Sequence, residues 1–119
     1  MKFFRDSQKD ESLVQRVMVG ILEGVKHIHG LGIAHRDIKP DNIVMSSHDR
    51  NGAIPKLIDF GLSKVFHIEE LSSEAYGTLA FVSPEIVLGM KHNKQTDVWS
   101  LGVLLFIMLS NTIPFLSKN

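Results

Sequence analysis

The sequence predicts a mainly α fold with one short β-hairpin, and three observations lead to this prediction. The first third of the chain carries apolar residues at helical spacing. Its last quarter contains a run that is apolar on every side of a helix. Between them, Asn51-Gly52 separates two short apolar segments and is a strong hairpin signal. The 119 residues are enough for one domain.

The first element is a helix predicted from Asp10 to Leu31. Ser7 or Asp10 can cap its start, and glycines at its end favour termination. Its apolar residues follow the i, i+3, i+4, i+7 spacing and should form one buried face: Leu13, Val14, Val17, Met18, Ile21, Leu22, Val25 and Ile28.

Two strands are predicted next, Ile43–Met45 and Lys56–Ile58, with Asn51-Gly52 in the turn. Residues Leu62 to Pro84 show no sustained periodicity, so we expect one long loop there. Loops of that length in a compact domain are usually functional or mobile.

The last element is a helix that starts near Thr96 or Asp97 and cannot continue past Pro114. We expect other parts of the protein to surround it, because its apolar residues cover all sides. They are Trp99, Leu101, Val103, Leu104, Phe106, Ile107, Met108 and Leu109.

Composition narrows the class of function. The formal net charge is zero, which removes a global electrostatic case for binding nucleic acid or a membrane surface. The chain has no cysteine, so disulfides and thiolate metal sites are excluded. The start turns charged at once, unlike a signal peptide, and Val98–Leu109 is too short to span a bilayer. We therefore expect an intracellular, cytoplasmic protein.

The most informative motifs are His35–Asn42 (HRDIKPDN) and Asp59-Phe60-Gly61. Asp37 can accept a proton, and Lys39 can neutralise phosphate charge. Asn42 and Asp59 offer the oxygen ligands that Mg²⁺ prefers. Phosphoryl transfer depends mainly on such positioning and charge stabilisation.

These two motifs, followed by GTLAFVSPE, DVWSLGV and Ile113-Pro114-Phe115, occur in the order found in protein kinases. The chain resembles the C-terminal (large) lobe of such a kinase, and residues 1–119 are interpreted as an incomplete domain of that fold. Lys39 fits the serine/threonine class, which uses ATP to phosphorylate protein hydroxyl groups. Within that class, the sequence is most similar to calcium/calmodulin-dependent and calcium-dependent kinases.

The resemblance implies roles for individual residues. Asp37 would orient the acceptor hydroxyl and accept its proton, with Lys39 beside the transferred phosphate. Asn42 and Asp59 would hold Mg²⁺, and Val44 would pack against the adenine of ATP. Supporting positions are also implied: His35 stacked on Phe60, Leu104 and Met108 below Val44, Asp97 on the backbone of the His35 turn, and Thr78 close to Asp37 and Lys39.

Arg36 marks a kinase type in which a phosphate on the activation loop often pairs with that arginine. Glu74 lies three residues before Gly77, where many relatives carry a phosphorylated threonine. We expect its carboxylate to pair with Arg36 and Lys64, so that loop order does not depend on phosphorylation at this position.

Three histidines, His27, His29 and His35, lie close together in the sequence and suggest a metal site. We prefer the interpretation that these histidines do not bind a metal, because His27 and His29 fall on different faces of one helix. No cysteine or acidic cluster completes a zinc set.

No Gly-rich GxGxxG segment occurs in the sequence. The expectation is that the small lobe and the last helices of the domain are missing, and the sequence does not say which partner would supply that lobe. Nucleotide binding should then be very weak and the isolated chain inactive. Two alternatives remain open: a truncated, catalytically inactive kinase-like interaction module, and a faulty gene assignment without a stable product.

Overall fold

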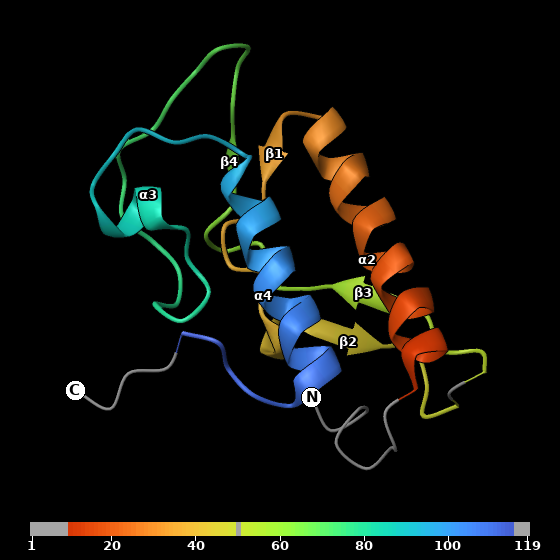
Figure 1. Cartoon of the computed structure of the whole chain (residues 1–119). Coiled ribbons are helices and arrows are strands. Elements are labelled where there is room, and N and C mark those ends of the chain that lie inside the picture. The colour runs from red at the N-terminus through yellow and green to blue at the C-terminus, as the bar shows by residue number, and fades with distance from the viewer. Residues whose placement is uncertain (1–9, 50, 116–119) are drawn as a thin grey trace.

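The computed structural model describes residues 10–49 and 51–115 of the chain. Two antiparallel helices, α2 (Glu11–Gly30) and α4 (Thr96–Ser110), lie side by side and form the body of the fold (Figure 1). The short elements are β1 (Ile33–Ala34), the 3₁₀ turn η1 (Pro40–Asn42), β2 (Ile43–Met45), β3 (Pro55–Leu57), β4 (Lys64–Val65) and α3 (Pro84–Val87). The described part is therefore a mixed α and β structure.

Helix α2 confirms the first predicted element and begins one residue later than expected. Asp10 is its N-cap, and its Oδ1 accepts hydrogen bonds from the Ser12 and Leu13 N–H groups at 3.0 and 3.2 Å. Ser7, the other candidate cap, lies outside the described residues. The helix buries most of the predicted face, although Leu22 is nearly half exposed.

Strands β2 and β3 confirm the predicted hairpin, with Ile43 opposite Leu57 and Met45 opposite Pro55. The second strand runs from Pro55 to Leu57, so the prediction of Lys56–Ile58 was shifted by one residue. The hairpin packs against α2, where Gly20 allows Pro55 to approach closely.

The segment predicted as one long loop contains regular structure. Strand β4 pairs with β1, and an isolated bridge joins Ser72 to His92. Periodicity could not reveal these contacts, because each strand has only two residues. Helix α3 begins at Pro84, the residue at which the predicted loop ends.

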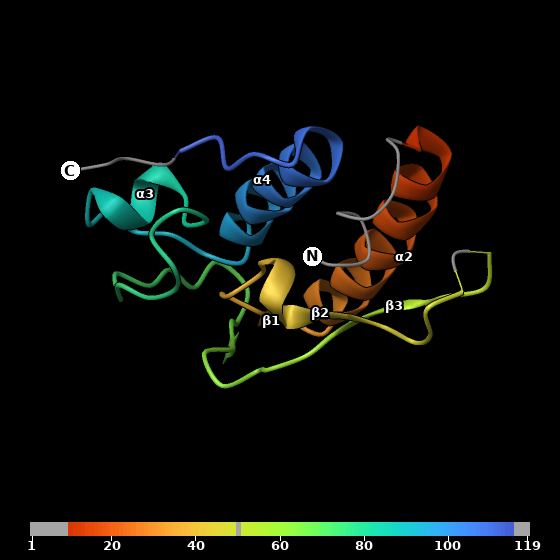
Figure 2. The same ribbon diagram turned by 90° about the horizontal axis from the view of Figure 1, so that it is seen from below.

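Helix α4 is covered less than its sequence predicted. Leu101, Leu104 and Met108 are buried in the core with α2, whereas Val98, Trp99, Phe106 and Leu109 are between 37% and 56% exposed. Figures 1 and 2 show α4 between α2 and α3. The expectation of a surrounded helix is wrong for the described residues, because they do not cover its second side.

The core lies between α2, α4 and the hairpin. Val17 and Leu104 are fully buried, and Ile21, Ile38 and Ile43 pack around them. Burying one such side chain contributes roughly 1.5–3 kcal/mol to the free energy of folding. The cluster therefore stabilises the two helices and the hairpin, and with them the ends of the loops that start from these elements. Among the described residues, no helix combines the length and apolar character needed to cross a membrane.

Candidate functional site

The turn after β1 is held by a buried carboxylate at the start of α4. Asp97 is 1% exposed; its Oδ2 accepts the His35 N–H at 2.8 Å and its Oδ1 accepts the Arg36 N–H at 3.0 Å. Arg36 has a left-handed φ of 72°, which is strained for a residue with a Cβ atom. The predicted contact between Asp97 and this turn is present.

His35 connects this turn to the end of β3. The Asp37 N–H donates to His35 Nδ1 at 3.1 Å, so Nδ1 carries no proton. Nε2 then carries the proton and donates to the Ile58 carbonyl at 2.9 Å. The His35 ring also meets Phe60 edge-on, with ring centroids 4.7 Å apart. The expected pairing of His35 and Phe60 is present, and it fixes Asp37 relative to the chain entering Asp59.

Asp37, Lys39 and Thr78 form one polar cluster. Lys39 Nζ donates to Thr78 Oγ1 at 2.9 Å and lies 3.9 Å from Asp37 Oδ2. Thr78 Oγ1 is 3.4 Å from Asp37 Oδ1. The arrangement places a carboxylate, an ammonium group and a hydroxyl together in a half-buried position. A carboxylate beside a hydroxyl can accept its proton, and a nearby cation can stabilise negative charge.

Asn42 and Asp59 lie on neighbouring chain segments. Asn42 is buried, and its Nδ2 donates to the Asp37 carbonyl at 2.7 Å and to Asp37 Oδ2 at 3.1 Å. The backbone carbonyl of Asn42 accepts the Ile58 N–H at 2.9 Å, which places Asp59 one residue from this contact. Asp59 is exposed with a left-handed φ of 58°, and its Oδ1 accepts the Gly61 N–H at 3.2 Å.

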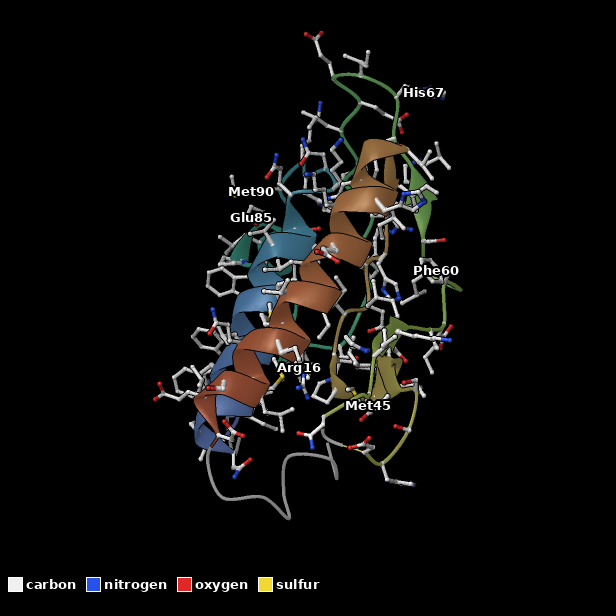
Figure 3. The ribbon with its side chains drawn as sticks, turned by 90° about the vertical axis from the view of Figure 1, so that its right-hand side faces the viewer. Arg16, Met45, Phe60, His67, Glu85 and Met90 are labelled. Atoms are coloured by element: carbon white, nitrogen blue, oxygen red, sulfur yellow. The ribbon has the colours of Figure 1, made fainter. Side chains whose placement is uncertain are left out.

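Val44 lies on β2 and is 45% exposed. Beneath this strand, its neighbour Ile43 belongs to the same buried cluster as Leu104 and Met108. Figure 3 shows Phe60 beside the strands, whereas Glu85 and Met90 lie behind α4. The strand that exposes Val44 is therefore anchored in the core through Ile43.

Arg36 is also the centre of a second cluster. Its Nη1 lies 3.7 Å from Glu74 Oε1, its Nε donates to the Leu62 carbonyl at 2.6 Å, and its guanidinium lies 4.3 Å from the centroid of the Tyr76 ring. Burial raises the pKa of Tyr76, and its hydrogen bond to Thr96 opposes that shift. The predicted approach of Glu74 to Arg36 is present.

The predicted pairing of Lys64 with Glu74 is wrong. Lys64 Nζ instead lies 3.1 Å from Glu70 Oε2. The pairing of β4 with β1 directs this part of the chain toward the turn that contains Glu70. The His67 N–H and Lys64 both lower the pKa of Glu70 by stabilising its carboxylate.

The protein kinase domain family matches residues 2–119. The chain belongs to the protein kinase family. It is 43% identical over 115 residues to rabbit serine/threonine-protein kinase 17A. The aligned region covers 97% of this chain and 29% of that kinase. It is 43% identical over 109 residues to Arabidopsis thaliana serine/threonine-protein kinase AtPK1/AtPK6, covering 92% of this chain and 23% of that kinase.

Calcium-dependent protein kinase 4 of Plasmodium falciparum is 36% identical over 104 residues, covering 87% of this chain and 20% of that kinase. The chain thus spans between a fifth and three-tenths of the length of these kinases. Membership of the family and the similarity to serine/threonine and calcium-dependent kinases are confirmed. The structure is accordingly a partial kinase fold.

Two polar contacts of this kinase chain could not be predicted from the sequence. His29 Nε2 lies 2.8 Å from Asp97 Oδ2, and Ser100 Oγ donates to the Phe81 carbonyl at 2.7 Å. Ser100 stood within an apolar helix, so its burial was predictable but its partner was not. His29 is polar in the last turn of an amphipathic helix, and only the packing of α4 against α2 identifies its partner.

Proposed function

We propose that this chain is the catalytic part of the large lobe of a serine/threonine protein kinase, with residues 1–119 forming an incomplete kinase domain. The reaction is transfer of the terminal phosphoryl group of ATP to a serine or threonine hydroxyl of a protein. The observation that supports it best is the cluster of Asp37, Lys39 and Thr78, in which a carboxylate, an ammonium group and a hydroxyl are already in reach of one another.

Asp37 acts as the general base in this proposal. Its Oδ1 lies 3.4 Å from the Thr78 hydroxyl oxygen, and an acceptor hydroxyl of a substrate would approach the same carboxylate oxygen. Its backbone is fixed through His35 and Asn42, which removes the need for reorganisation during the reaction. Lys39 neutralises charge on the transferred group, and Thr78 holds the Lys39 ammonium in place.

The residues fit a magnesium-bound nucleotide. Within the described residues, no hydrogen bond engages Asn42 Oδ1 or Asp59 Oδ2, which leaves two oxygens free as ligands. Oxygen donors of this kind suit Mg²⁺, which supplies charge neutralisation on the phosphates when it is bound. Val44 would carry the adenine on its exposed apolar surface.

Glu74 has a regulatory role in this proposal. Its carboxylate lies beside the Arg36 guanidinium, directly before Asp37 in the sequence, where a loop phosphate would otherwise pair. The loop that contains Glu74 would then be ordered without phosphorylation at this position. Lys64 contributes from the other side, because its pair with Glu70 ties an earlier part of that loop to β4.

A magnesium-dependent binding experiment tests the proposal. The amide resonances of Val44 and Gly61 should shift when ATP and Mg²⁺ are added together, and the shifts should vanish without Mg²⁺. Asp59→Asn should abolish this dependence, because it removes one anionic ligand. Asp49→Asn, a change at an exposed carboxylate of the hairpin turn, is the matched control and should leave it unchanged. Equal shifts in the Asp59 and Asp49 variants would refute the magnesium assignment.

The 119 residues include no Gly-rich phosphate loop, so we expect no measurable phosphorylation of a serine peptide by the chain alone. Phosphorylation that disappears in Asp37→Asn would contradict this expectation.

A second candidate function is a catalytically inactive, kinase-like interaction module. A groove of about 1020 Å³ runs along α4 and favours it, with Trp99, Phe106 and Phe115 among its lining residues. The same binding experiment separates the two functions. An interaction module does not need magnesium-dependent nucleotide binding, and a kinase lobe does.

A further inference from the structure

Tyr76 is the only tyrosine of the chain, and the proposed reaction does not use it. It lies two residues after Glu74 in the same loop. The guanidinium carbon of Arg36 lies 4.3 Å from the centroid of the Tyr76 ring, and the Tyr76 hydroxyl lies 2.6 Å from Thr96 Oγ1. One side chain therefore contacts both the residue before Asp37 and the first residue of α4.

We infer that Tyr76 is a positioning residue, which holds the loop that contains Glu74 against the Arg36 guanidinium without an ion pair or a phosphate. The inference rests on the proposed function and deepens its regulatory part, because only that function gives the order of this loop a role in the reaction. Its physical content is separate: an aromatic ring and its hydroxyl connect the turn before Asp37, the loop and the start of α4.

The Arg36 guanidinium needs such a contact, because its polar contacts are incomplete. The side chain is 8% exposed, and within the described part of the chain its Nη1 is buried without a hydrogen-bond acceptor. Glu74 Oε1 lies 3.7 Å from Nη1, which is too long for a hydrogen bond, and solvent screens this pair because the Glu74 side chain is 60% exposed. The face of an aromatic ring attracts a cation, and more strongly where water is excluded. The Tyr76 ring therefore compensates for part of the missing hydrogen bonding.

The Tyr76 ring is itself fixed by its hydroxyl. Thr96 Oγ1 donates its only hydrogen to the Asn93 carbonyl at 3.1 Å, so the Tyr76 hydroxyl is the donor in its contact with Thr96. His92 meets the Tyr76 ring edge-on, with ring centroids 5.3 Å apart. Both His92 and Thr96 are buried. The segment that leads into α4 therefore sets the position of the ring.

The loop is attached at two points to this same segment. Ser72 and His92 exchange backbone hydrogen bonds at 2.7 and 2.8 Å, and four residues later Tyr76 contacts Thr96. Figure 1 shows the loop after β4 passing the segment that leads into α4. Between the two attachments lie three exposed residues, 73–75. If the attachment through Tyr76 is lost, this stretch is held at one end only.

NMR relaxation of the whole chain tests the inference at Ala75, the residue before Tyr76. Tyr76→Leu removes the ring and keeps an apolar side chain, so the order parameter of the Ala75 amide should fall from about 0.85 to below about 0.6. Tyr76→Phe keeps the ring, so this order parameter should stay above about 0.6. Glu74→Gln removes the charge of the neighbouring contact and is the matched control. It should leave the value within about 0.1 of the parent chain.

Two further measurements separate positioning from overall stability. The Arg36 Nε–H resonance reports the ring contact directly, because an aromatic ring displaces the resonances of protons held near its face. It should move in Tyr76→Leu and stay in Glu74→Gln. In the parent chain, raising the salt concentration from about 0.05 M to about 0.5 M should leave the Ala75 order parameter unchanged, because salt screens an exposed ion pair far more than a buried contact. A variant that is only less stable keeps its order parameters, since these report fast motion of the folded chain.

A positioning role is supported if Ala75 becomes mobile and the Arg36 resonance moves in Tyr76→Leu alone. It is overturned if Ala75 keeps its order in Tyr76→Leu, or if Tyr76→Phe is as mobile as Tyr76→Leu. It is also overturned if Glu74→Gln or added salt mobilises Ala75 to the same degree, because the ion pair then holds the loop. If Tyr76→Leu does not fold, the salt series and Tyr76→Phe decide. None of these measurements uses nucleotide or Mg²⁺, so a failure here is distinct from a failure of the proposed function.

Discussion

Replacing Ser83 with alanine should stabilise the chain, although the substitution removes a polar group from the segment before α3. Ser83 is 1% exposed, and its Oγ is buried without a hydrogen-bond partner. It is the N-cap residue of α3, but its side chain makes no capping hydrogen bond. Its φ of −69° is equally accessible to alanine. The hydroxyl therefore bears a desolvation cost without a compensating contact.

The magnitude follows from that cost. An unsatisfied buried hydroxyl costs about 1–3 kcal/mol, and removing it without changing the Cβ position should recover about 1 kcal/mol. Ser100 is the matched control, because it is also buried but donates to the Phe81 carbonyl at 2.7 Å. Ser100→Ala loses that bond and leaves the Phe81 carbonyl without this donor, which lowers the free energy of unfolding by about 1–2 kcal/mol. The higher helix propensity of alanine offsets less than about 0.7 kcal/mol of this loss.

Urea unfolding measures both changes. The chain has a single tryptophan, Trp99 on α4, so its fluorescence and the helical circular dichroism report the same transition. Ser83→Ala should raise the midpoint, and Ser100→Ala should lower it, with unchanged slopes. A lower midpoint for Ser83→Ala would refute the reasoning, because it would mean that the hydroxyl is hydrogen-bonded in solution.

Two further predictions concern packing and the Arg36 cluster. Gly20→Ala should lower the free energy of unfolding by about 1–3 kcal/mol, because its Cβ would lie 2.8 Å from Pro55 Cγ, whereas Gly102→Ala meets no atom within 4 Å and should raise it by up to about 1 kcal/mol. Thermal unfolding of both variants checks this, and equal shifts would show that the α2–β3 contact is not tight. Glu74→Ala should cost less than about 1 kcal/mol, because Glu74 is 60% exposed and its pair with Arg36 is screened by solvent. Arg36→Ala should cost about 2–3 kcal/mol, because it also loses the bond to Leu62 and the contact with Tyr76. Urea unfolding compares the two, and equal losses would mean that the ion pair dominates the cluster.

The long elements could be predicted because their signals are local. The spacing from Leu13 to Val25 indicates one buried face whatever else the chain does, and Asp10 fits the cap position by its chemistry alone. Asn51-Gly52 indicates a turn for the same reason. The short strands β1 and β4 were missed because a two-residue strand has no period, and it exists only through its partner.

In the candidate site, too, some features follow from local sequence motifs and others depend on the tertiary structure. Asp37, Lys39, Asn42 and Asp59 could be chosen from the order of the motifs, because the chemistry of phosphoryl transfer requires those residue types. The pairing of Lys64 could not be predicted, because two nearby glutamates compete for one ammonium group and the path of the backbone selects between them. Glu70 is selected.

The sequence by itself determined the family, the two helices, the hairpin and the residue types of the candidate site, because each depends on local spacing or on motif order. Only the tertiary structure decided which side of α4 is covered, which acid pairs with Lys64, and that His29 and Asp97 meet across 68 residues of sequence. Such contacts depend on how the two helices pack, and no local pattern encodes the distance between segments that far apart.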